Sequence, residues 1–326
     1  MGYTKLLVLK GTKSSDMSNL VESITWSGRK GAPARSITIN LIDDDSYGHD
    51  RSGIACEEGH HCIFYWQGNE LFQGIFMNDK RNNSKKLFAK AYDSGIYLSN
   101  NKDSFCYSNK TASDIFKDCM SRCEMPIGTV ADTGYIIPEL PKPKTTYTDV
   151  ILDALSQTYK ATGNRFYPLS MKGKISLLDR KKNVLQWVIE TGVNLITYEY
   201  TKSIENTKTR IRLLTNEGKV LAEKVDKNLE KKIGIFQDVD TPKDSLNEAQ
   251  LNDLIASILK EKGIKRTLNI TALGISNAYS GMCLHVIIKE LGISKTYYID
   301  EDTHTFQGRK HTMSLKLLEM SEFKED

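Results

Sequence analysis

Long apolar runs are absent from this sequence, and cysteine and proline are scarce. Six of the 326 residues are cysteine and seven are proline. Six cysteines are far too few for a scaffold held together by disulfides, which favours a reducing compartment. No apolar run approaches the ~18–20 residues that span a bilayer, and the run at residues 6–9 is too short for the core of a signal peptide. We therefore expect neither membrane insertion nor standard secretion.

An excess of charge of one sign is also missing. The chain has 45 Lys and Arg residues against 41 Asp and Glu residues, a formal net charge of +4, and Asn and Ser interrupt its basic stretches, as at residues 80–86. A surface that binds nucleic acid needs clustered basic residues with interleaved aromatics, or a recognisable motif. The sequence has neither, so we predict no recognition of nucleic-acid sequence.

The chain does have enough apolar residues for several cores. Apolar residues make up 39% of the sequence and charged residues 26%, which is typical of a globular protein. Since domains commonly have roughly 100–200 residues, this length predicts two or three domains.

Residues 1–105 have the pattern of a β-rich domain. Apolar and polar residues alternate in residues 36–41, which places Ile37, Ile39 and Leu41 on one face of a strand. Two aromatic-rich runs flank Gly68 and predict a hairpin. Several such hairpins indicate a small barrel or sandwich. The expected strands are residues 5–9, 36–42, 61–66, 71–77 and 87–92.

Residues 106–190 predict an α+β domain. Helices are expected to begin at Thr111 and Thr146, because each is followed three residues later by an aspartate that completes a capping box. Residues 138–143 contain three prolines and predict a stiff connection between the two helices. Residues 166–179 predict a hairpin that turns at Lys172 and Gly173.

Residues 191–326 return to a strand pattern and predict a second β-rich domain. A helix near residues 245–262 interrupts it, with an expected capping box formed by Ser245 and Glu248. The predicted fold is therefore mixed β and α+β, with two small β-barrels flanking an α+β middle domain. Residues 62–76 and 283–299 resemble each other faintly as hairpins. The expected strands are residues 195–200, 209–214, 219–225, 266–272, 283–288, 296–300 and 312–318.

One cluster resembles a metal site. Cys56, His60, His61 and Cys62 lie within seven residues, together with two glutamates. A structural zinc site needs two pairs of ligands on separate segments, and no second pair follows. Because a strand begins near His61, consecutive side chains point to opposite faces and do not converge on one ion. We predict no metal site.

Catalytic motifs are missing in every class considered: nucleophile elbow, paired cysteine and histidine, zinc-protease helix, phosphate-binding loop and dinucleotide-binding glycines. Acidic clusters occur at residues 43–45 and 300–302, each at an expected strand end, where a solvated acidic turn is the simplest interpretation. We predict no catalytic residue and no cofactor.

Several short motifs, taken in order, resemble those of a known family. The stretch from Ile24 to Ile37 is similar to the opening of XkdQ-type proteins, which are hub proteins of contractile phage tails and phage-like particles in the late control D or baseplate hub superfamily. The resemblance spans nearly the whole chain. Further landmarks follow in the family's order: residues 70–76, residues 111–114, Leu273-Gly274, Ser280-Gly281-Met282, residues 298–306 with His304, and residues 311–315 with His311.

This resemblance implies a structural hub rather than an enzyme. Its subunits form a homotrimer in which each carries two similar barrels, so that six barrels match a six-fold tail tube while three-fold symmetry matches a spike. The implied partners are further copies of this chain, the tail tube protein, the spike protein and other baseplate proteins. The implied place of assembly is the bacterial cytoplasm, for a phage or a tail-like bacteriocin.

The segment from Trp26 to Arg35 is the expected partner-contact loop, because glycine and proline shape it and its charges have no local partners. Its candidate contact residues are Trp26, Gly28, Arg29, Lys30, Pro33 and Arg35. An ordinary surface loop is the alternative. Tyr65, Trp66 and Phe72 are candidate interface anchors, or else fill their own barrel.

Two other functions stay open at this point. A hydrolase would place His304 or the aspartates at 43–45 in a pocket with perturbed pKa values. A cytoplasmic ligand-binding module would be a monomer with one concave apolar pocket. A hub needs extended flat interfaces instead.

Overall fold

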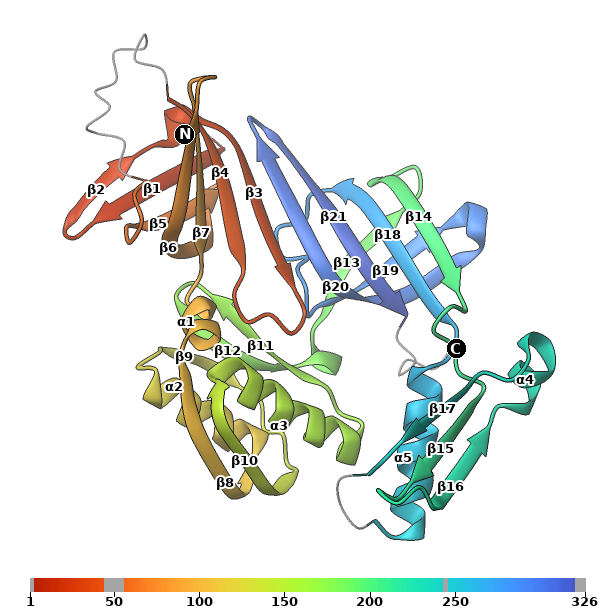
Figure 1. Ribbon diagram of the computed structural model, residues 1–326. Helices are drawn as coiled ribbons and strands as arrows, with labels where there is room; N and C mark the ends of the chain where they lie inside the picture. The colour runs from red at the N-terminus through yellow and green to blue at the C-terminus, as the bar shows by residue number, and fades with distance from the viewer. Residues whose placement is uncertain (1–2, 44–55, 243–245, 320–326) are drawn as a thin grey trace. The chain divides into compact units, whose positions relative to one another are not determined.

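The computed structural model describes residues 3–43, 56–242 and 246–319. It divides into two compact units, one formed by Met1–Tyr198 with Asn269–Asp326 and the other by Glu199–Leu268 (Figure 1). Strands outnumber helices in the described residues, so the prediction of a mainly β protein with some α+β structure is confirmed. No helix in these residues is long and apolar enough to cross a membrane.

A 13-stranded sheet dominates the first unit (Figure 1). Its strands pair in the order β14-β18-β21-β20-β3-β4-β7-β6-β5-β1-β2, and β19 pairs with both β20 and β13. The bounds of these strands are β1 Thr4–Lys10, β2 Lys13–Asp16, β3 Val21–Arg29, β4 Ser36–Ile42, β5 His61–Trp66, β6 Asn69–Asn82, β7 Lys86–Tyr92, β13 Val184–Glu190, β14 Leu195–Ser203, β18 Lys265–Leu273, β19 Cys283–Ile288, β20 Ile293–Gln307 and β21 Lys310–Glu319.

The strand order of this sheet contains the same arrangement twice. The N-terminal set pairs as β3-β4-β7-β6-β5-β1, and the C-terminal set pairs as β14-β18-β21-β20-β19-β13. The hairpins at residues 62–76 and 283–299, which resembled each other in the sequence, occupy the same position in the two sets. The two sets differ in the strand at the end of each order. β1 runs antiparallel to β5, whereas β13 runs parallel to β19.

Hydrogen bonds between β20 and β3 join the two sets into one sheet. The regions expected as separate barrels are therefore continuous in their strand pairing. The two-barrel layout and the domain boundaries near residues 105 and 190 stay predictions.

The N-terminal set surrounds its own core. Ile37, Ile39 and Leu41 on β4 are fully buried, as their alternation with polar residues predicts. Phe306 of β20 belongs to the same core, where its ring centroid lies 5.0 Å from that of Phe64. The C-terminal set thus completes the core of the N-terminal set.

Residues 95–179 form three helices and two small sheets within the first unit. Both expected N-caps are confirmed: the Thr111 hydroxyl accepts the Asp114 amide in a capping box, and the Thr146 hydroxyl accepts the Asp149 amide. The helices and sheets share one apolar core. The bounds are α1 Gly95–Asn100, β8 Lys102–Thr111, α2 Ala112–Arg122, β9 Ile127–Val130, β10 Ile136–Thr146, α3 Tyr147–Thr162, β11 Phe166–Met171 and β12 Lys174–Asp179.

The proline-rich segment was predicted wrongly. Residues 138–143 are not a connection but part of strand β10, which pairs with β8 in a two-stranded sheet. Proline cannot donate a hydrogen bond, but it is tolerated on an edge strand, where one side of the backbone needs no partner. The hairpin at residues 166–179 is confirmed, with positive φ at both Lys172 and Gly173 as a two-residue turn requires.

The second unit has its own sheet and core. Ile211 and Leu213 of its sheet pack with Leu251 and Ile255 of a helix. The expected helix near residues 245–262 is therefore present, in a compact unit of its own. The bounds are β15 Arg210–Leu214, β16 Val220–Val225, α4 Lys227–Ile233, β17 Gln237–Asp240 and α5 Glu248–Glu261.

The cap of this helix differs from the prediction. Asn247 and Gln250 form the capping box, since each side chain accepts the backbone N–H of the other residue. Ser245, the expected cap, lies outside the described residues.

Candidate functional site: a buried polar network between two strand sets

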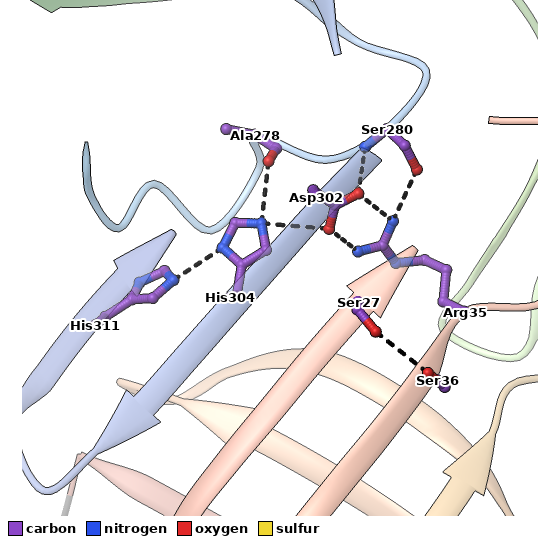
Figure 2. A network of polar contacts seen from close by, with 8 residues as sticks. All are labelled: Ser27, Arg35, Ser36, Ala278, Ser280, Asp302, His304 and His311. Carbon is purple, nitrogen blue, oxygen red and sulfur yellow. Dashed lines mark hydrogen bonds and ion pairs between the residues drawn. The ribbon is translucent and has the colours of Figure 1, made fainter. Parts of the chain in front are cut away.

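Polar side chains are buried where the two strand sets meet (Figure 2). Arg35, which precedes β4, and Asp302 on β20 are each 2% exposed. Arg35 Nη1 donates to Asp302 Oδ1 at 3.0 Å, and Nη2 donates to Oδ2. This bidentate ion pair connects residues that lie 267 positions apart in the chain. Such pairing fixes orientation as well as charge.

Other groups complete the surroundings of this ion pair. The Ser280 amide donates to Asp302 Oδ1 at 2.6 Å, and the Arg35 guanidinium lies 4.2 Å from the ring centroid of Trp26 on β3. A cation over an aromatic face is attracted electrostatically. Burial alone would raise the pKa of Asp302, but the positive charge of Arg35 and the hydrogen bonds hold that pKa below its ordinary value.

Two histidines extend the network along the sheet (Figure 2). His304 Nε2 lies 3.0 Å from the Ala278 carbonyl oxygen, and its Nδ1 lies 3.0 Å from His311 Nε2. Since a carbonyl can only accept, Nε2 of His304 carries the proton and Nδ1 accepts from His311. Burial lowers the pKa of His304 to about 4, and burial with the neighbouring His304 lowers the pKa of His311 to about 3. Both rings are therefore neutral at pH 7.

A second buried carboxyl group, that of Asp93, also interacts with Arg35. The Asp93 amide donates to the Arg35 carbonyl oxygen at 3.1 Å, and the Gly95 amide donates to Asp93 Oδ1 at 3.0 Å. Burial raises the pKa of Asp93 to about 7, although hydrogen bonds to its carboxylate from the backbones of Arg35 and Gly95, and the Arg35 charge, oppose the shift.

Two glycines make room for the network. A Cβ atom at Gly28 would lie 2.3 Å from Arg35 Nη1, and one at Gly274 would lie 2.1 Å from the His311 ring. Neither position can carry a side chain unless its neighbour moves. Several landmarks of the family resemblance, including Gly28, Arg35 and Gly274, thus converge on this one network.

The structure shows that the segment from Trp26 to Arg35 is partly strand, and partner contact by its residues stays a prediction. Trp26, Gly28 and Arg29 belong to β3, and Trp26, Pro33 and Arg35 are buried in this chain. The charge of Arg35 has a partner, but that partner is far away in sequence. Arg29 is exposed and remains a candidate contact. The Lys30 ammonium lies 5.3 Å from the Tyr298 ring centroid.

Of the candidate hydrolase residues, Asp43 and His304 are described by the structure, and both are buried. Asp302 and its acidic neighbours lie within β20 rather than in a solvated turn, which corrects that expectation. His304 is fully buried with a partner on each ring nitrogen, so a substrate cannot reach it. Asp43 is 7% exposed, while the aspartates at 44 and 45 lie outside the described residues.

The cysteine and histidine cluster is divided between two environments. Cys56 and Cys62 are buried, whereas His61 is exposed, as strand alternation predicts. Burial raises the pKa of the Cys56 thiol to about 12. In the ranges that the structure describes, no group of three or more such side chains is placed to hold a metal ion.

The candidate aromatic anchors on β5 and β6 contribute mainly to the core. Trp66 is 5% exposed and Phe72 is 2% exposed, and both belong to the core of the N-terminal set. They fill their own strand set, as the alternative interpretation holds. Tyr65 is half-buried.

Comparisons with known proteins agree with the sequence resemblance. Residues 24–318 match a protein family described as YQBQ-like. The chain is 35% identical over 320 residues to YqbQ and to the phage-like element PBSX protein XkdQ, both of Bacillus subtilis (strain 168), covering 97% of this chain and 96% and 97% of those proteins. The resemblance to XkdQ-type proteins is confirmed.

Solved structures have the same fold at low sequence identity. The 43 kDa tail protein of prophage MuSo2 from Shewanella oneidensis has a TM-score of 0.75 and 10% identity, covering 96% of this chain and 97% of that chain. The E. coli c3393 protein, a type VI secretion component described as similar to the T4 phage tail proteins gp27 and gp5, has a TM-score of 0.58 and 11% identity, covering 98% and 77%.

Proposed function

The chain belongs to the YQBQ-like family, and from this premise we propose that it is a structural hub of a contractile phage tail or of a phage-tail-like particle. Its relative XkdQ, matched over almost its whole length, is named as a protein of a phage-like element. The fold is shared with proteins named for phage tails. Family and fold thus support the same role.

The repeated strand order is the observation that carries this proposal. Each chain holds two sets of strands with the same pairing order, and the two sets are joined side by side through β20 and β3. Three such chains would supply six similar sets around an axis while keeping three-fold symmetry. A homotrimer of this kind adapts a six-fold tail tube to a three-fold spike.

The proposed partners are therefore further copies of this chain, the tail tube protein, the spike protein and other baseplate proteins. The role is assembly rather than catalysis. The network that resembles a reactive site is buried, and Arg35, Asp302 and His304 are held by partners within the chain. Such a network holds strands together and is not accessible to a substrate.

Imaging of assembled particles tests this function. Tube, spike and hub proteins would be produced together and the particles examined by electron microscopy with an antibody fragment against this chain. The proposal predicts three copies in one ring between the tube and the spike. Particles that assemble normally without this chain, or that carry it in six copies along the tube, would contradict it.

A further inference from the structure

Strand β14 ends the sheet with an exposed apolar edge. It stands last in the strand order, so β18 is its one neighbouring strand among the described residues. Ile196 on this strand is 52% exposed and Tyr198 is 37% exposed. An exposed strand edge that carries apolar side chains is a template for pairing with another strand.

The counterpart of β14 in the N-terminal set shows what covers such an edge. β3 contains Ile24-Thr25-Trp26, and β14 contains the similar Ile196-Thr197-Tyr198. Ile24 is fully buried and Trp26 is 1% exposed, and β20 runs alongside them on the outer edge of β3. The same residue pattern is therefore covered in one set and exposed in the other.

The counterpart of β20 is β6, and among the described residues part of β6 has a neighbouring strand on one side only. Both strands shift register once, between Phe76 and Asn78 in β6 and between Ile299 and Glu301 in β20. Beyond the shift, β20 pairs with β21 on one side and β3 on the other. Beyond its own shift, β6 pairs with β7, and no second strand lies beside it in the part of the chain that is described.

Charged residues repeat at matching positions. Asp302 is the second paired residue after the shift in β20, and Asp79 is the second after the shift in β6. Arg35 stands two residues before the buried Ile37 of β4, and Arg266 stands two residues before the buried Leu268 of β18. Arg35 and Asp302 pair within one chain. Arg266 is exposed, and Asp79 is half-buried with its Oδ2 3.8 Å from Arg81 Nε.

We infer that β14 of one copy pairs antiparallel with residues 78–82 of β6 in the next copy, repeating between chains the contact that β3 and β20 make within one chain. The inference rests on the proposed hub function and names the surface through which the hub assembles. Because the two edges differ, the contact is head-to-tail, and such contacts close into a ring of three when each copy is rotated by a third of a turn from the last.

The register of this interface follows from its counterpart. Thr25 lies opposite Thr305, and Ser27 lies opposite Thr303. By equivalence Thr197 faces Asn82 of the next copy, and Glu199 faces Lys80. Opposite charges placed across two strands stabilise their pairing. Arg266 then stands where it reaches Asp79 of the neighbouring copy, as Arg35 reaches Asp302.

A designed disulfide tests this register. Thr197→Cys and Asn82→Cys would be combined in a background with the exposed Cys106→Ser, because directly opposed residues in antiparallel strands lie ~4.5–5.5 Å apart between Cα atoms, within disulfide range. The matched control is Thr25→Cys with Thr305→Cys, which must close within one chain. The mass of each protein in solution would first be measured by light scattering. The protein would then be oxidised and analysed on a denaturing gel without reductant.

The inference predicts covalent dimers and trimers for the double variant, no cross-linked oligomers for either single variant, and dimers but no trimers when the two single variants are mixed. The control must cross-link without a change in mass. A trimer in solution that gives no cross-link overturns the interface and leaves the hub proposal standing. A monomer at every concentration, with no cross-link, overturns both.

Discussion

Removing the carboxylate of Asp302 separates the effect of burial from the effect of charge, because the preceding residue, Glu301, provides a natural comparison. Asp302 pairs with Arg35 in the interior, whereas Glu301 pairs with Lys316 at 2.7 Å on the surface. Both acids lie on β20. The two substitutions, Asp302→Ala and Glu301→Ala, each remove one ion pair from the same strand.

The expected losses of stability differ several-fold. Asp302→Ala leaves the Arg35 charge buried without its partner, which typically costs ~3–5 kcal/mol in the free energy of unfolding. Glu301→Ala removes an ion pair whose side chains are half-exposed, worth ~0–1 kcal/mol. The double variant Arg35→Met with Asp302→Leu removes both charges and is expected to lose less stability than Asp302→Ala alone.

Urea unfolding followed by tryptophan fluorescence measures these losses at one fixed protein concentration. Two of the three tryptophans, Trp26 and Trp66, lie in the core beside the network and report on it. Equal losses for Asp302→Ala and Glu301→Ala would refute the reasoning, as would a double variant that loses as much stability as Asp302→Ala alone.

Three further predictions concern the same region. Burial lowers the pKa of His304 to about 4 and of His311 to about 3. The folded state therefore binds fewer protons than the unfolded state below pH 6.5. The free energy of unfolding measured with urea should fall as the pH is lowered from 6.5 to 4, by up to ~3 kcal/mol for His304, and His304→Gln should diminish this fall. Burial raises the pKa of Asp93 to about 7, so its contribution to stability should decrease from pH 4 to 7, and Asp93→Asn should flatten that slope; an unchanged slope would contradict the pKa. Gly28→Ala should cost ~1–3 kcal/mol because its Cβ collides with Arg35, and an unchanged thermal midpoint would show that the guanidinium moves freely.

Local sequence patterns predicted many of the strands, but not β3, β8 or β13. The strands at residues 36–42, 61–66 and 283–288 have the predicted bounds, because alternation and flanking turn residues are local signals. Helix starts were predicted where a hydroxyl and an acid lie three residues apart. The strand β10 was not predicted, because its prolines indicated a connection instead. A strand tolerates proline when it lies at the edge of a sheet, and whether it does so depends on the tertiary fold.

The buried network could not be predicted from local sequence. Arg35 was interpreted as an unpaired surface charge because its partner lies 267 positions away. Asp302 sits among acidic residues and therefore resembled a solvated turn. The signal that was available is the pair of glycines at 28 and 274, each of which makes room for a large polar side chain.

The mass of the purified chain in solution tests the central claim most directly. Light scattering across a concentration series, with a reducing agent present, measures it without reliance on any partner. A trimer near three times 36.8 kDa, or a monomer–trimer equilibrium that shifts with concentration, is the predicted result. A stable dimer, or a monomer at every concentration, would contradict a hub built from three copies with two strand sets each.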